Sequence, residues 1–168
     1  MALDATVGGA NANSYCLVSE ADAYHAQTLN ASVWTAATNG TKETALQWAT
    51  RILDTEVDWA GWIVTETQAL RWPRGEVYTR DGVLLSQLAI PAFLKQATAE
   101  LAKHLIAGDR TAEAGSVGIA ELTVDVINIV FDKSDKKTVL PPSVLAMIRP
   151  YGTALNGSGL SMVKLARV

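Results

Sequence analysis

The fold class of this chain is decided by the stretch ALQWATRIL, residues 45–53. Apolar residues recur there every three or four positions, which is the spacing of an α-helix with one buried face. The stripe consists of Ala45, Leu46, Trp48, Ala49, Ile52 and Leu53. Because a stripe this wide packs against more than one neighbour, we predict a long helix that Thr41 caps and that runs to about Val57.

Three further helices are expected around this one. Ser19, followed three residues later by Asp22, has the spacing of an N-cap and its acid, and predicts a short helix over about residues 20–29. Pro91 suits the first turn of another helix, since that turn leaves its N–H groups unpaired in any case. The apolar face that follows, before Gly108 ends the helix, consists of Leu94, Ala97, Leu101 and Leu105. A short fourth helix is expected over about residues 143–149.

After residue 115 the pattern changes from helical to extended. Apolar and polar residues alternate, first through Leu122, Val124 and Val126 and then, out of phase, through Ile127, Ile129 and Phe131. This indicates either one long strand with a bulge or two strand segments. We therefore predict one mainly α domain over residues 1–168. It is a small bundle of three to four helices (helical core at about 14–110) with a strand-rich insertion at about 116–140 and an extended C-terminal arm at about 156–168.

Composition limits the class of protein. The chain has 168 residues, a net charge of −3 and a pI of about 5.3, so it forms one domain without a global basic field for nucleic acid or anionic membranes. Cys16 is the only cysteine, which excludes an intrachain disulfide and favours a reducing compartment. No apolar run has transmembrane length, and the first residues do not have the pattern of a signal peptide. We expect a soluble protein made in a cytoplasm.

Charge is unevenly distributed along the chain. Up to Glu66 there are eight acids and two bases, whereas after Asp135 there are five bases and no acid. Opposite charges at the two ends would support head-to-tail contacts between copies, but chance clustering on a solvated surface explains such small counts equally well. The tightest cluster, Asp54, Glu56 and Asp58, is expected to be a solvated helix end, because alternate helical positions do not converge on one cation.

The sequence offers little for catalysis. His25 and His104 each fall within an expected helix and lack a second ligand or orienting acid at a defined spacing. A nucleophilic pair of Cys16 with a histidine stays open, but structural roles are favoured for all three. No serine elbow and no phosphate-binding glycine loop is present. We therefore expect no enzymatic activity, no cofactor and no metal site.

The segment Gln68–Arg74 is rich in residues that fix a backbone and bind partners. Pro73 pushes Trp72 towards an extended conformation. Planar cations nearby belong to Arg71, Arg74 and Arg80. The segment therefore indicates a binding or assembly element.

The chain has five tryptophans, which is many for its length. Trp48 lies on the apolar stripe and is expected in the core, and Trp34 and Trp59 are expected to pack under loops. Only Trp72 has arginines beside it. For Trp72, packing within the chain is favoured first, a protein interface second and stacking on unpaired bases third.

Several short motifs, taken in order, together resemble one family. They are residues 12–15 (ANSY), 19–24 (SEADAY), 45–54 (ALQWATRILD), 68–74 (QALRWPR), 81–82 (DG), 90–91 (IP), 99–102 (AELA) and 140–145 (LPPSVL). The chain resembles tailed-bacteriophage proteins often labelled DnaT-like ssDNA-binding, which are similar to head–tail connector (adaptor) proteins. The resemblance covers nearly the whole chain and is weakest from residue 115 to residue 137.

This resemblance implies a structural protein of the virion neck, synthesised in the host cytoplasm. Such proteins form a ring, typically of twelve subunits, beneath the portal, where the ring extends the DNA channel and docks the stopper or tail. The implied partners are the portal protein, a stopper or tail-completion protein, further copies of the chain, and double-stranded DNA that passes through the lumen without sequence readout. No membrane is involved. The alternative is a single-stranded DNA-binding accessory protein of replication, which the acidic balance of the chain opposes.

The candidate site residues are therefore contact surfaces. In the central loop, ring contacts or determinants of folding are expected at Arg71, Trp72, Arg74 and Arg80. In the C-terminal arm, contacts with a neighbouring subunit or the portal are expected at Leu160, Met162, Val163, Lys164 and Arg167.

Overall fold

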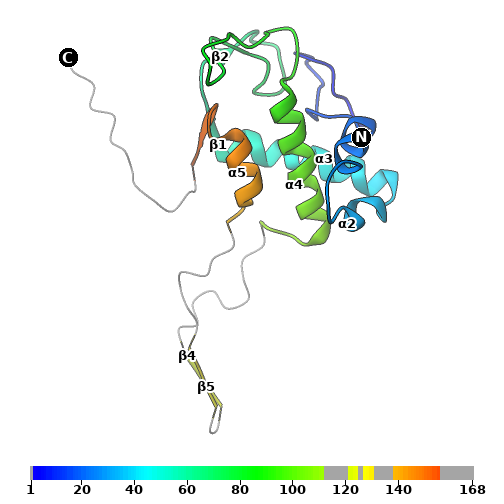
Figure 1. The fold of residues 1–168 in the computed structure, drawn as a ribbon, viewed down its shortest axis with the longest axis vertical. Coiled ribbons are helices and arrows are strands. Elements are labelled where there is room, and N and C mark those ends of the chain that lie inside the picture. Colours follow the sequence, from blue (N-terminus) through cyan, green and yellow to red (C-terminus); the bar gives the residue numbers. More distant parts are fainter. Residues whose placement is uncertain (1, 112–120, 125–126, 131–137, 156–168) are drawn as a thin grey trace, which may run out of the picture.

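The computed structural model describes residues 2–111, 121–124, 127–130 and 138–155. Five helices lie in this part of the chain: α1 (Val18–His25), α2 (Ser32–Thr35), α3 (Asn39–Glu56), α4 (Ala92–Ala107) and α5 (Pro142–Ile148). Helix α4 contacts each of the other four, and α3 crosses it at the centre of the helical body (Figure 1). This arrangement agrees with the mainly α class expected from the sequence.

The core lies where the apolar stripes of α3 and α4 meet. Thr38 caps α3, because its Oγ1 accepts a hydrogen bond of 3.3 Å from the N–H of Thr41, the residue expected to be the cap itself. The buried hydrophobic residues of the two helices are Ala45, Leu46, Ala49, Ile52, Leu53, Leu94, Ala97, Ala99, Leu101 and Ala102. Complete burial of one leucine contributes about 1.5–3 kcal/mol, so this contact stabilises the fold.

Trp48 does not join this core. Its side chain is 41% exposed, so the expectation that it is buried is wrong. The reason is geometric: at 3.6 residues per turn, position 48 lies roughly a third of a turn from the centre of the buried face, which Leu46, Ala49 and Leu53 define. Trp48 therefore lies at the solvent edge of the stripe.

Helix α1 differs in detail from its prediction. Leu17 is the N-cap, and Glu20 rather than Asp22 provides the carboxylate, which accepts the Leu17 N–H at 3.0 Å. Asp22 instead accepts hydrogen bonds from Trp34 Nε1 and from a lysine of α3, at 2.8 and 2.9 Å. The helix also ends before residue 29, and α2 follows it with Trp34 fully buried. The short α2 was not expected, because four residues carry no periodic pattern.

Three antiparallel strand pairs connect the helices. They are β1 (Val57–Trp59) with β6 (Gly152–Ala154), β2 (Trp62–Ile63) with β3 (Arg74–Gly75), and β4 (Glu121–Val124) with β5 (Ile127–Val130). In the third pair Val124 lies opposite Ile127, so the alternating segment forms two strands rather than one. The other two pairs were not expected, because each strand is only two or three residues long.

Gly61 forms the turn from β1 to β2. Its φ is +70°, and a Cβ at this position would lie 2.0 Å from the carbonyl oxygen of Gly75. Only a residue without a side chain fits such an approach. The turn therefore packs directly on β3.

The expected C-terminal arm and most of the strand-rich insertion lie outside the described residues. The expected domain boundaries there stay predictions. Within the described part, no helix is long and apolar enough to cross a membrane.

Candidate functional site

The aromatic side chain of the segment 68–74 is buried. Trp72 is 1% exposed, and its ring meets those of Trp59 and Phe93 edge to face, with centroids 5.6 Å apart in both pairs. The peptide bond from Trp72 to Pro73 is cis. Trp72 is therefore a core residue of its own chain, which is the placement that the sequence favoured over an interface.

Asp54 binds this segment to α3. Its carboxylate accepts the Tyr15 hydroxyl on one oxygen and the Arg71 backbone N–H, at 3.1 Å, on the other. Burial raises the pKa of Asp54, although both hydrogen bonds oppose the rise, and burial with the adjacent carboxylate raises the pKa of Tyr15 well above its usual value. The expectation of a solvated acidic cluster is wrong at Asp54, because the loop before Trp72 covers the end of α3.

Arg74 makes its contacts within the fold. Its Nε donates to the Ala60 carbonyl at 2.7 Å, and its terminal nitrogens donate to the carbonyls of Trp59, Gly61 and Arg71 at 3.2, 2.6 and 3.3 Å. One planar cation thus joins the turn after β1 to the segment before β3. This placement fits the role of a determinant of folding, which was one of the two roles expected for Arg74.

The other expected contact residues fall into two groups. The side chains of Arg71 and Arg80 are exposed, and neither forms a hydrogen bond or ion pair within the described part of the chain. The expected contacts of the arm, at Leu160, Met162, Val163, Lys164 and Arg167, lie outside the described residues.

Exposed apolar residues gather on the loops around Trp72. Of thirteen large hydrophobic residues that are exposed in the described part, seven lie between residues 62 and 88. We call these seven the apolar loop face: Trp62, Ile63, Val64, Tyr78, Val83, Leu84 and Leu88. The β2–β3 pair and hydrogen bonds of 2.8 Å from Thr79 N to Val83 O and from Leu85 N to Val77 O order this backbone. Figure 1 shows these loops together at one end of the molecule, beside the start of α4. Sequence reasoning missed this face, because it weighed residues near Trp72 for charge alone.

The exposed side of α3 carries a second candidate surface. Trp48 lines two hollows of about 490 and 560 Å³, which lie on either side of it. The guanidinium carbon of Arg51 lies 5.2 Å from the centroid of the indole ring, which is the geometry of a cation–π contact. Leu70 lines the first hollow, so the loop before Trp72 also reaches this surface.

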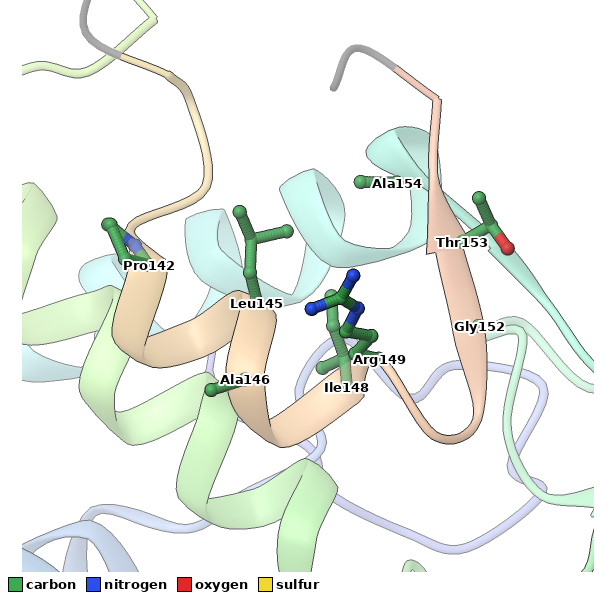
Figure 2. A pocket seen from close by; sticks show the side chains of 8 residues that line it. All are labelled: Pro142, Leu145, Ala146, Ile148, Arg149, Gly152, Thr153 and Ala154. Carbon is green, nitrogen blue, oxygen red and sulfur yellow. The ribbon is translucent and has the colours of Figure 1, made fainter. Parts of the chain in front are cut away.

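A third hollow, of about 570 Å³, lies between α5 and β6. Figure 2 shows Leu145 and Ala154 on its two sides and the guanidinium of Arg149 between them. Its described lining is mostly aliphatic, and Arg149 is the one charged residue among these described side chains. The hollow lies beside the strand from which the rest of the chain continues.

The residues that could carry chemistry have structural partners. His25 is buried, with Nε2 3.1 Å from the Ala99 carbonyl, and His104 Nε2 lies 3.4 Å from Glu100 Oε1. Burial raises the pKa of Cys16 to about 12, which disfavours the reactive thiolate. In the part of the chain that the structure describes, no cluster of His, Cys, Asp or Glu could hold a metal ion. The absence of enzymatic activity stays a prediction.

Comparison with known proteins identifies one family. All residues, 1–168, match the family described as "Putative DnaT-like ssDNA binding protein". The chain belongs to this family. No curated protein and no solved structure matches it. The family description favours single-stranded DNA binding, the alternative function expected from the sequence, and says nothing of a connector ring.

Proposed function

We propose that this protein is an assembly protein of the phage neck, a head–tail connector that forms a ring beneath the portal and uses the apolar loop face as a contact between subunits. The observation that carries the proposal is the concentration of seven exposed large hydrophobic residues on hydrogen-bonded loops. Apolar patches on a soluble protein mark interaction sites when they are large and contiguous. The sequence resemblance to connector proteins supports the same function.

The distribution of positive charge favours a protein interface over a DNA-binding groove. Nine of the fourteen lysine and arginine side chains are described. Lys42, Lys95 and Lys103 form ion pairs, Arg74 and Arg110 donate to backbone carbonyls, and Arg51 lies over Trp48. The remaining described cations, which make no such contact there, are Arg71, Arg80 and Arg149. A groove that follows a nucleic-acid backbone needs a row of free cations. Three such cations among the described residues do not form a row of this kind. This small number suits a channel that lets DNA pass without sequence readout.

The oligomeric state of the full chain tests this proposal. Leu88→Asp introduces a charge on the apolar loop face at a side chain that is 88% exposed, and Leu29→Asp, also 88% exposed but on the loop after α1, is the matched control. In native mass spectrometry over a range of concentrations, we expect the wild type and Leu29→Asp to form a closed ring and Leu88→Asp to stay monomeric. Equal assembly by all three refutes the apolar loop face. If the wild type is monomeric, the same three proteins are compared for binding to the portal protein.

The family description favours a second function, the binding of single-stranded DNA. The exposed Trp48 with Arg51 over its ring agrees with it, since aromatic and arginine side chains are the usual partners of unpaired bases. This function predicts that a fluorescent oligothymidylate gains anisotropy on binding the full chain and loses it as salt rises. No change in anisotropy at low salt refutes this function and leaves the connector untouched.

A further inference from the structure

The solvent side of α3 differs in charge from the rest of this acidic chain. The exposed residues three, four or seven positions from Trp48 are polar or cationic, and none is a carboxylate; they are Thr41, Thr44, Arg51 and Thr55. The partly exposed Glu43 lies at the edge of this side, four residues before Gln47. The nearest carboxylate in the next turn, Asp54, is engaged by Tyr15 and by the Arg71 backbone. A phosphate could approach Trp48 between Thr44 and Arg51 without meeting a carboxylate at helical spacing from the indole.

Trp48 is placed for a flat ligand. Its indole lines both hollows of about 490 and 560 Å³, so it forms part of the wall between them. Arg51, one turn along α3, stands over the ring at 5.2 Å. The first hollow is also lined by Asn13, whose amide is held within the fold: it accepts the Asp4 N–H at 2.8 Å and donates to the Ala2 carbonyl at 2.9 Å.

A second cation lies next to this hollow. Leu70 lines it, and the Arg71 backbone that follows is held to α3 through Asp54, three residues beyond Arg51. The Arg71 side chain is exposed. Two exposed arginines therefore lie at α3: Arg51 over the indole, and Arg71 on the loop that Asp54 joins to the same helix.

We propose that Trp48 is a stacking site for one base of single-stranded DNA, with Arg51 and Arg71 binding the adjacent phosphates. This inference rests on the second proposed function and locates it. An exposed indole with Arg51 over its ring and no carboxylate at helical spacing from it fits an anionic strand with a flat base better than it fits an apolar peptide. Two phosphate contacts also set the salt dependence: log K should fall with log salt with a slope of about −1.4, far shallower than for a protein with a basic groove.

Binding and photocrosslinking of the full chain test this site. The probe is an oligothymidylate with one 5-iododeoxyuridine, measured by anisotropy and then crosslinked and mapped by mass spectrometry. We expect the crosslink at Trp48 and an affinity about 5- to 150-fold weaker in Trp48→Ala, which is the range for loss of one stacked base. Leu29→Ala, at an 88% exposed side chain that belongs to neither candidate surface, is the control and should bind like the wild type. Arg71→Gln should reduce the salt slope by about 0.7.

Three results would overturn the inference, and they differ in what else they overturn. If the wild type binds no oligonucleotide, single-stranded DNA binding itself fails with the site. If it binds but Trp48→Ala binds equally and the crosslinks map elsewhere, only this site fails. If Trp48→Ala changes the oligomeric state in native mass spectrometry while DNA binding is unchanged, the face is a contact between protein subunits. Melting temperatures of all variants, measured in parallel, separate loss of binding from loss of folding.

Discussion

Replacement of Trp72 by alanine would separate a core role from an interface role more clearly than any other single change. The indole is 1% exposed and packs edge to face on Trp59 and Phe93, so truncation removes a large buried ring and leaves a cavity. Such truncations cost about 3–5 kcal/mol. A domain of this size loses roughly 2–4 °C in melting temperature per kcal/mol. We therefore expect Trp72→Ala to lower the melting temperature by about 6–20 °C.

Trp72→Phe refines the same prediction. The Nε1 atom of Trp72 is buried and has no hydrogen-bond partner among the described residues. Phenylalanine therefore loses no hydrogen bond and avoids the cost of a buried unpaired N–H, which is about 1–3 kcal/mol. This gain offsets part of the lost volume, so Trp72→Phe should be less stable than the wild type by only about 1–2 kcal/mol.

Circular dichroism during heating, with native mass spectrometry on the same samples, measures both effects. Leu29→Ala is the control: its side chain is 88% exposed and lies outside the apolar loop face, and its loss should cost less than about 1 kcal/mol. An unchanged melting temperature in Trp72→Ala together with loss of the ring would refute the reasoning, because it would place the indole at a contact between subunits.

Two further predictions concern the polar contacts of the same segment. Arg74→Lys should lower the free energy of unfolding by about 2 kcal/mol, because the lysine ammonium cannot reach all four carbonyls that the planar guanidinium binds. At the exposed Arg80, the same change to lysine should cost less than about 0.5 kcal/mol. Equal losses of stability in urea titrations of the two variants would contradict this prediction. Asp54→Asn should remove a pH dependence of the free energy of unfolding. Because burial raises the pKa of Asp54, its contribution to stability is fully present below the unfolded pKa near 3.8 and falls as pH rises through the higher folded pKa. The stability difference, wild type minus Asp54→Asn, should therefore fall as pH rises above about 3.8, and a difference that rises with pH would disprove the assignment.

The two long helices could be predicted because their stripes are local and strong. Helix α4 begins directly after Pro91 and ends before Gly108, as the sequence indicates, and α3 begins two residues before the expected cap, Thr41. Trp48 shows the limit of this reasoning. An apolar residue at the edge of a stripe has the same spacing whether it faces a neighbouring helix or solvent. Only the position of α4 decides whether such a residue is buried.

The strand pairs and the role of Asp54 could not be predicted, because they depend on contacts between distant residues. Val57 pairs with Ala154, and neither strand has a pattern of its own. Asp54 looked like one member of a solvated cluster, and its burial depends on Arg71, seventeen residues further along. The composition of residues 68–74 did identify a structurally important segment. It could not show that Arg74 bonds to the backbone within the fold while Arg71 and Arg80 face solvent.

The pair β1–β6 fixes the position of Leu155, the last residue that the structure describes. The Leu155 N–H donates to the Glu56 carbonyl at 2.8 Å, so the chain departs at the end of α3. Thirteen residues follow Leu155 in the sequence, and at about 3.3–3.6 Å per residue their backbone spans at most about 47 Å. Within one copy, the backbone of these residues must lie inside a sphere of that radius around Leu155. A zero-length crosslink from one of these residues to a residue well outside the sphere must therefore join two copies of the chain. Such a crosslink distinguishes a segment that is exchanged between copies from one that docks on its own copy, and it requires no knowledge of the assembly.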